Sequence, residues 1–137
     1  LGLAMATAAI ANNGVLLKPR MVKSVAAADG AVLTRTEPEI ARKNFVDPGS
    51  LAIIREAMHQ TVTKGAAGSL AGLPGSAAGK TGTAETGVGE NTHAWFTTFA
   101  PFEDPKIVLT VLVENAGIGS QVAVPIAKEV MEWYLTK

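Results

Sequence analysis

Hydrophobic and polar positions divide the first third of the chain into a helix followed by extended segments. The apolar, alanine-rich run 1–11 predicts a helix that ends at 12–14, where a glycine follows two asparagines. Residues 15–25 read as extended, and Asp29-Gly30 marks a hairpin turn into a strand at 31–34. This part of the chain therefore predicts one helix and one hairpin.

A second helix is predicted to begin at Asp47-Pro48, because this pair combines an N-cap residue with proline at the first helical position. Apolar residues then recur at spacings of three and four and form one stripe: Leu51, Ile54, Met58 and Val62. Gly65 ends the helix. The glycine-rich segment from Gly65 to Gly75 reads either as a mobile flap or as a simple linker.

Three strand-like segments follow. Residues 78–85 alternate weakly, and 93–100 are rich in aromatic residues and threonine. Residues 107–113 are almost entirely β-branched or leucine, which is typical of a central strand covered on both faces. Because the links are short, the three strands are expected to form an antiparallel meander.

The chain closes with a helix predicted over 121–135. Pro125 is expected in or near its first turn, because proline deeper in a helix removes a hydrogen bond and breaks the helix. Four apolar residues are assigned to its sheet-facing side: Val122, Ile126, Val130 and Trp133. The predicted fold class is α+β, with helices packed on an antiparallel sheet.

Composition narrows the possible functions. The net charge is zero, so no basic patch argues for nucleic acid or an anionic membrane surface. There is no cysteine, and the two histidines stand apart, so no metal site and no cofactor are expected. Only 18% of residues are charged, and the first helical pattern has no cap residue. We therefore expect the C-terminal part of a larger domain.

The most informative motif is Gly-Lys-Thr-Gly-Thr, which begins at Gly79. Lys80 supplies a positive charge, and the hydroxyls of Thr81 and Thr83 supply rotatable donors. Gly79 and Gly82 are expected to remove side chains where a ligand would otherwise clash. Together these residues suit an anionic ligand that lies close to the backbone.

A phosphate-binding P-loop is one interpretation of this motif. Its pattern G-x-x-x-x-G-K-[ST] requires a first glycine where the chain has Pro74, and Gly75 comes one residue too late. Gly82 and the glycine-containing run 86–91 stand where a helix should continue, at a cost of about 1 kcal/mol per glycine. The sequence therefore argues against a P-loop.

The second interpretation is the K-T-G strand of the penicillin-interacting serine enzymes. Lys80-Thr81-Gly82 would lie on an accessible edge strand, where a peptide-like substrate pairs as an added strand. Three residues alone also fit a polar edge strand protected by a lysine. The neighbouring segments have to separate these two possibilities.

Four segments, one of which contains this motif, decide the matter, because they follow one family's order over nearly the whole chain. On them the chain resembles the C-terminal half of the transpeptidase domain of class B penicillin-binding proteins. The segments are MATAAIANNG at 5–14 with KP at 18–19, GKTGTAE at 79–85, HAWF with FAP within 93–101, and VLVEN at 111–115 with AVPIA at 123–127.

The resemblance implies acyl transfer in peptidoglycan cross-linking. A serine attacks a stem peptide ending in D-Ala-D-Ala, and β-lactam antibiotics imitate that donor. Lys80 would hold the polar network of the active site, and the Thr81 and Thr83 hydroxyls would bind the substrate carboxylate. The Thr83 N–H would be an oxyanion donor, with Gly82 allowing close approach. The resemblance also implies the extracytoplasmic face of the bacterial cell membrane, with an anchor that is not in this chain.

The chain departs from the family pattern in one respect. It contains no S-x-x-K and no S-x-N motif, both of which precede the opening helix in this family. Residues 1–137 are therefore expected to be the C-terminal part of a single transpeptidase domain, inactive alone and partnered by the N-terminal half of the same protein. The alternatives are a serine β-lactamase or β-lactam sensor on the same fold, and a non-catalytic scaffold module.

Other polar and aromatic residues receive plainer interpretations. Glu85 is expected to be a solvated charge at a strand end, and His93 a structural histidine. Trp95 and Phe96 are expected to serve the core and strand pairing.

Overall fold

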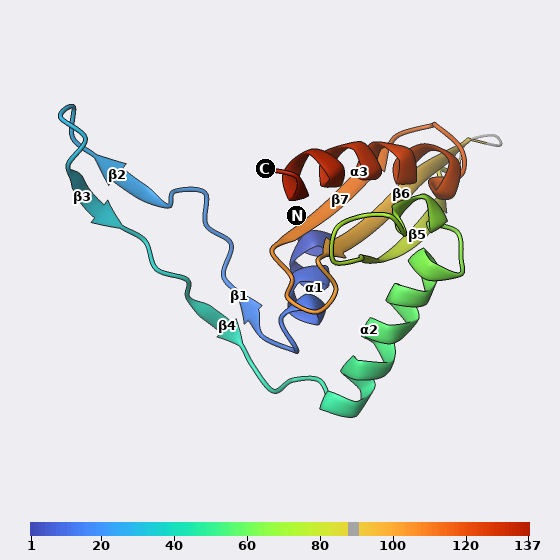
Figure 1. Ribbon diagram of the computed structural model, residues 1–137, viewed down its shortest axis with the longest axis horizontal. Coiled ribbons are helices and arrows are strands. Elements are labelled where there is room, and N and C mark those ends of the chain that lie inside the picture. The colour runs from blue at the N-terminus through green and yellow to red at the C-terminus, as the bar shows by residue number, and fades with distance from the viewer. Residues whose placement is uncertain (88–90) are drawn as a thin grey trace.

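The computed structural model describes residues 1–87 and 91–137. Over these residues the helices are α1 (Gly2–Ala11), α2 (Pro48–Thr63) and α3 (Gly119–Leu135), with a short 3-10 helix η1 (Gly68–Leu70). The strands are β1 (Leu16–Leu17), β2 (Ser24–Ala26), β3 (Val32–Arg35), β4 (Ile40–Arg42), β5 (Ala78–Glu85), β6 (Thr92–Ala100) and β7 (Ile107–Val113). Figure 1 shows the helices gathered around the β5–β7 sheet. The α+β prediction is confirmed.

The sheet that carries the motif is an antiparallel meander in the order β5-β6-β7. Strand β5 is therefore an edge strand, as the K-T-G interpretation required. The prediction that 107–113 form the central strand is wrong, because β6 is the strand that pairs on both sides. Strand β7 is apolar because it contacts α1 and α3, and two covered faces do not require two paired edges.

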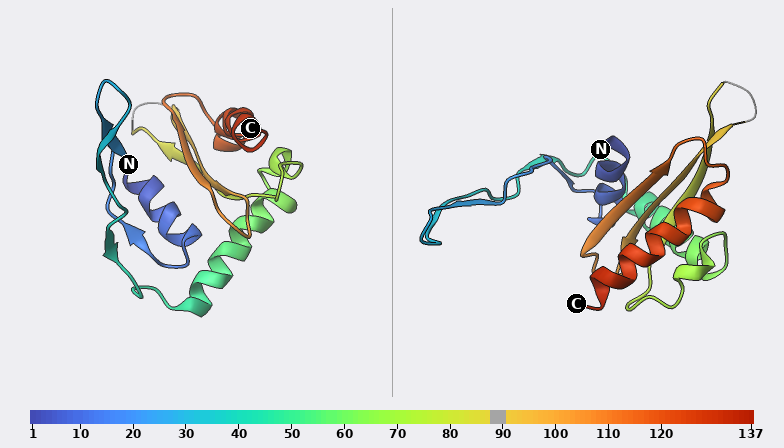
Figure 2. Two further views of the ribbon diagram at one scale, coloured as in Figure 1. Left: turned by 60° about the vertical axis from the view of Figure 1, so that its left-hand side comes forward. Right: turned by 90° about the horizontal axis from the view of Figure 1, so that it is seen from above.

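Helices cover both faces of this sheet (Figure 2). Helix α3 covers one face, where Phe96 packs with residues of α3 and η1. Helices α1 and α2 cover the other, where Phe99 packs with Met58 and Ala11. Successive side chains of β5 alternate between these two environments.

Helix α3 differs from its prediction in two ways. It begins at Gly119 rather than Gln121, so Pro125 lies in the second turn, which still agrees with a position near the first turn. Gln121, whose carbonyl loses its helical partner there, is exposed and open to water, as is Pro125. The predicted sheet-facing side is also wrong for three residues, which are 40–61% exposed: Ile126, Val130 and Trp133. The buried side is instead Ala123, Val124, Ala127 and Met131, because small residues let the helix approach the sheet.

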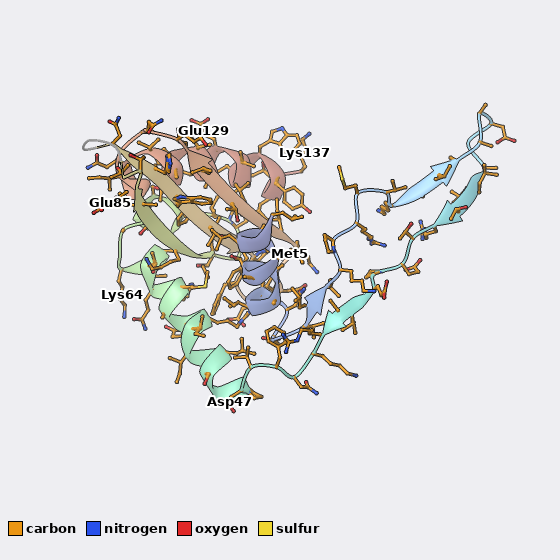
Figure 3. All side chains as sticks on the ribbon, turned by 180° about the vertical axis from the view of Figure 1, so that it is seen from behind. Met5, Asp47, Lys64, Glu85, Glu129 and Lys137 are labelled. Atoms are coloured by element: carbon orange, nitrogen blue, oxygen red, sulfur yellow. The ribbon has the colours of Figure 1, made fainter. Side chains whose placement is uncertain are left out.

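Helix α2 begins at the predicted cap. The Asp47 carboxylate accepts the Ser50 N–H at 2.8 Å, and Pro48 occupies the first turn (Figure 3). Leu51, Met58 and Val62 of the predicted stripe are buried. Ile54 remains 39% exposed because it borders a groove between α1 and α2.

The Asp47 cap contributes to the stability of the fold. We expect Asp47→Ala to lower the free energy of unfolding by about 1 kcal/mol, because one first-turn N–H loses its acceptor. Asp47→Asn retains a capping oxygen and is the matched control. Urea unfolding of both variants checks this, and equal stability of the alanine and asparagine variants would contradict it.

The segments before and after α2 take different forms. Residues 15–46 form an extended arm in which β1 pairs with β4 and β2 with β3 (Figure 1). The predicted hairpin is confirmed, with Gly30 at a φ of 87°. The 65–75 segment is packed rather than open, because Ala67, Leu70 and Leu73 are buried in the core. Among the described residues, no helix has both the length and the apolar content needed to cross a bilayer.

Candidate active site

Lys80 lies at the edge of the sheet and faces the side covered by α1 and α2. Its side chain is exposed and lines an open cavity of about 460 Å³. The other lining residues include Leu3 and Ile10 of α1 and Met58 of α2. The Lys80 ammonium donates to the Thr81 carbonyl at 2.6 Å, so its charge is held at the rim of this cavity.

The cavity has a hydroxyl floor that the sequence reasoning missed. Thr97 lies opposite Lys80 on β6, and its Oγ1 is 2.8 Å from Thr7 Oγ1 and 2.9 Å from Thr110 Oγ1. Thr7 in turn donates to the Leu3 carbonyl at 2.9 Å. The only sequence signal was a threonine inside the alanine-rich run of α1. Residues 90 positions apart meet here, which no local pattern reveals.

The hydrogen-bonding pattern of β5 decides which main-chain groups face its free edge. Gly82 lies opposite Trp95, and a Cβ on Gly119 would stand 2.2 Å and 2.4 Å from their two carbonyl oxygens. Both oxygens therefore lie between the strands, as in a hydrogen-bonded antiparallel pair. Since such pairs alternate, Thr81 and Thr83 direct their N–H and C=O groups away from β6, toward the free edge.

The two threonine hydroxyls lie on the opposite face of β5 from Lys80. Thr83 is exposed, and its Oγ1 accepts the Gly119 N–H of α3 at 3.3 Å. Thr81 is half-buried on the same face. Lys80 and Gly82 thus border one face, Thr81 and Thr83 the other, and the four meet along the edge of the strand.

The two motif glycines have different surroundings. A Cβ on Gly79 would stand 2.5 Å from Cζ of the fully buried Phe96 ring, so this glycine makes room for the core. The prediction that Gly79 clears space for a ligand is wrong for this reason. A Cβ on Gly82 would approach the Trp95 Cβ at 3.2 Å on the Lys80 face.

The remaining polar candidates have structural roles or are solvated. His93 Nδ1 accepts the Asn115 N–H at 3.1 Å, which agrees with a structural histidine. Glu85 is exposed at the end of β5 (Figure 3). Across residues 1–87 and 91–137, no three His, Cys, Asp or Glu side chains come together in a way that could hold a metal ion.

The cavity beside Lys80 continues as an apolar groove between α1 and α2. A second cavity of about 410 Å³ shares Ala6, Ile10 and Ile54 with the first. Phe45 and Leu51 line its far end. Within the part of the chain that the structure describes, no serine lines either cavity.

Comparison with known proteins identifies relatives of this arrangement. Residues 1–132 match the family described as the penicillin binding protein transpeptidase domain. The peptidoglycan D,D-transpeptidase MrdA of Haemophilus influenzae is 33% identical over 100% of this chain and 24% of its own length. The peptidoglycan D,D-transpeptidase PbpA of Mycolicibacterium smegmatis is 38% identical over 91% of this chain and 27% of its own length.

Solved structures of penicillin-binding proteins resemble this chain as well. The imipenem acyl-enzyme complex of penicillin-binding protein A from M. tuberculosis superposes with a TM-score of 0.81 and 36% identity, over 96% of this chain and 29% of that one. The chain therefore spans about a quarter of the length of the curated relatives it matches.

Proposed function

This chain belongs to the penicillin-binding protein transpeptidase family, and from that premise we propose that it forms one wall of the active site of a peptidoglycan D,D-transpeptidase. The observation that carries the proposal is the edge strand β5. It presents a lysine to an open cavity and the Thr83 N–H to an unpaired edge.

The proposed reaction is acyl transfer. A serine attacks the carbonyl of a D-Ala-D-Ala stem peptide, the C–N bond to the last D-alanine breaks, and the acyl group passes to an amine of a neighbouring peptide. The peptide donor pairs along the free edge of β5 as an added strand. The Thr83 N–H then lies at the carbonyl oxygen and stabilises its developing negative charge, with Gly82 leaving the approach open.

Lys80 and the threonine hydroxyls have separate roles. The Lys80 ammonium orders the polar network around the attacking serine and makes the cavity favourable for anions. The hydroxyls of Thr81 and Thr83 donate to the terminal carboxylate of the substrate or of a β-lactam. A ligand lying along the strand edge contacts both faces of β5, so the two sets of groups act on one molecule.

The attacking serine comes from the N-terminal half of the same protein, which packs into the apolar groove between α1 and α2. Leu3 and Ile54 are 43% and 39% exposed along this groove, so both offer apolar surface to a segment seated in it. Because the groove runs to Lys80, a segment seated in it brings its side chains to the lysine. Residues 1–137 are thus the C-terminal part of one transpeptidase domain.

Transpeptidation is favoured over the alternatives. The relatives described above are named peptidoglycan D,D-transpeptidases, and a solved relative is an imipenem acyl-enzyme. A serine β-lactamase on this fold would release its acyl group within seconds, whereas a transpeptidase retains it. The proposed location is the extracytoplasmic face of a bacterial cell membrane, with the anchor outside this chain.

Labelling by a fluorescent penicillin tests the proposal. We expect the full-length protein to be labelled on one serine outside residues 1–137 and to keep the label for many minutes. The isolated chain should not be labelled, because the proposed nucleophile is not part of it. Heat-denatured full-length protein is the control for nonspecific reaction. Labelling of any residue within 1–137 would contradict the assigned roles.

A further inference from the structure

Gly119, the first residue of α3, lies where that helix meets the motif strand. Its N–H donates to Thr83 Oγ1 at 3.3 Å, which joins residues 36 positions apart. Gly119 itself is buried. The contact lies on the α3 face of β5, where the Thr81 and Thr83 hydroxyls are found.

Space, and not backbone conformation, requires glycine at this position. The φ of Gly119 lies outside the left-handed region, so other residues could adopt its backbone conformation. A Cβ, however, would stand 2.2 Å from the Gly82 carbonyl oxygen and 2.4 Å from the Trp95 carbonyl oxygen. Both obstacles are main-chain atoms of paired strands, which cannot rotate aside. Any side chain here must move the start of α3 away from β5.

The hydrogen bond from Gly119 decides what the Thr83 hydroxyl can do. A threonine hydroxyl has one proton and two acceptor lone pairs. One lone pair is occupied by the Gly119 N–H, so the hydroxyl proton remains available to a ligand on the exposed side of Thr83. A carboxylate is an acceptor only, and therefore matches this donor.

We propose that Gly119 is a positioning residue that holds Thr83 as a donor for the substrate carboxylate, and so helps determine specificity for ligands with a free carboxylate. This rests on the proposed function of the site. Gly119 acts through Thr83 and does not itself touch the ligand.

Acylation rates of the full-length protein with two ligands test this role. The ligands are benzylpenicillin and its methyl ester, which differ in the carboxylate. We expect Gly119→Ala to lower the preference for the free acid by about 10–100-fold, the size of one lost charge-assisted hydrogen bond. Thr83→Val should lower it similarly, and Thr83→Ser should restore it. Gly72→Ala is the matched control, because a Cβ there meets nothing within 4 Å.

The double variant Gly119→Ala/Thr83→Val separates positioning from general damage. If Gly119 acts through Thr83, the double variant should lose little more preference than either single variant. The positioning role would be overturned if the losses of preference in the two single variants added fully in the double variant. It would also be overturned if Gly119→Ala slowed acylation by the acid and by the ester equally. A wild-type protein labelled by neither ligand would instead refute the proposed function, and this inference with it.

Amide hydrogen exchange keeps the test decisive if Gly119→Ala fails to fold. Thr83→Val removes the acceptor of the Gly119 N–H, whereas Thr83→Ser keeps it. Exchange at the start of α3 should therefore quicken in the valine variant and stay at the wild-type rate in the serine variant. Equal exchange rates in all three proteins would sink the proposal.

Discussion

Lys80→Ala in the full-length protein should slow acylation by a fluorescent penicillin by about 10²–10⁴-fold, the range for loss of a group that assists proton transfer or charge stabilisation. The reason is that Lys80 brings the charge of the edge strand to the cavity in which the proposed serine is seated. The acylation rate of Lys80→Arg should lie between those of the wild type and Lys80→Ala, because the guanidinium keeps the charge but is larger and planar.

The fold should survive the loss of Lys80. Its side chain is exposed, and its ammonium donates to the neighbouring Thr81 carbonyl, an acceptor that water can replace. The midpoint temperature of thermal unfolding should therefore change little. Lys64→Ala is the matched control, because Lys64 is exposed at the end of α2 and does not line the cavity beside Lys80. Acylation of Lys80→Ala within a factor of about three of the wild-type rate would remove Lys80 from the mechanism.

The largest expected loss of stability comes from Arg55. Its guanidinium donates to the Ala11 carbonyl at 2.7 Å, the Ile10 carbonyl at 3.3 Å and the Phe102 carbonyl at 2.8 Å. It also lies 5.1 Å and 5.3 Å from the ring centroids of Phe99 and Phe102. One side chain of α2 thus joins the end of α1 to the β6–β7 connection.

We expect Arg55→Ala to lower the free energy of unfolding by about 2–4 kcal/mol. The substitution removes two or three charge-assisted hydrogen bonds and two cation–π contacts. Because Arg55 is only half-buried, water replaces part of these interactions. Arg55→Lys should recover only part of it, because a single ammonium does not span carbonyls on separate elements. Chemical denaturation of the full-length protein measures both changes.

Arg35→Ala is the control for the arginine substitution. Arg35 is exposed on β3 in the extended arm, so its replacement should change stability by less than about 0.5 kcal/mol. Equal effects of the two alanine substitutions would show that Arg55 does not hold the helices together.

Several parts of the fold followed from local signals. Asp47-Pro48 marked the start of α2 and Asp29-Gly30 marked the hairpin, because caps and turns depend on neighbours three or fewer residues away. The meander followed from strand-like segments joined by short links, and the edge position of Lys80 followed from the K-T-G interpretation. The absence of S-x-x-K likewise placed the attacking serine outside the chain as a prediction.

Long-range packing explains where those signals were insufficient. The buried side of α3 was assigned to large apolar residues, yet Ala123 and Ala127 face the sheet because close approach there favours small side chains. Gly79 was predicted to leave space for a ligand, yet the Phe96 ring fills the space that its side chain would take. Both contacts join residues that are far apart in the sequence. Neither produces a periodic pattern or a short-range motif from which it could be predicted.

By itself, the order of residues determined the three helices, the hairpin, the meander, the alternation of Lys80 against Thr81 and Thr83, and the family resemblance, since these depend on near neighbours and on spacing along one chain. Only the tertiary structure decided that Gly119 holds Thr83 and that Thr7 meets Thr97 beneath Lys80. Those contacts join residues 36 and 90 positions apart, and they exist because helices pressed onto opposite faces of one sheet bring distant hydroxyl and amide groups within hydrogen-bonding distance.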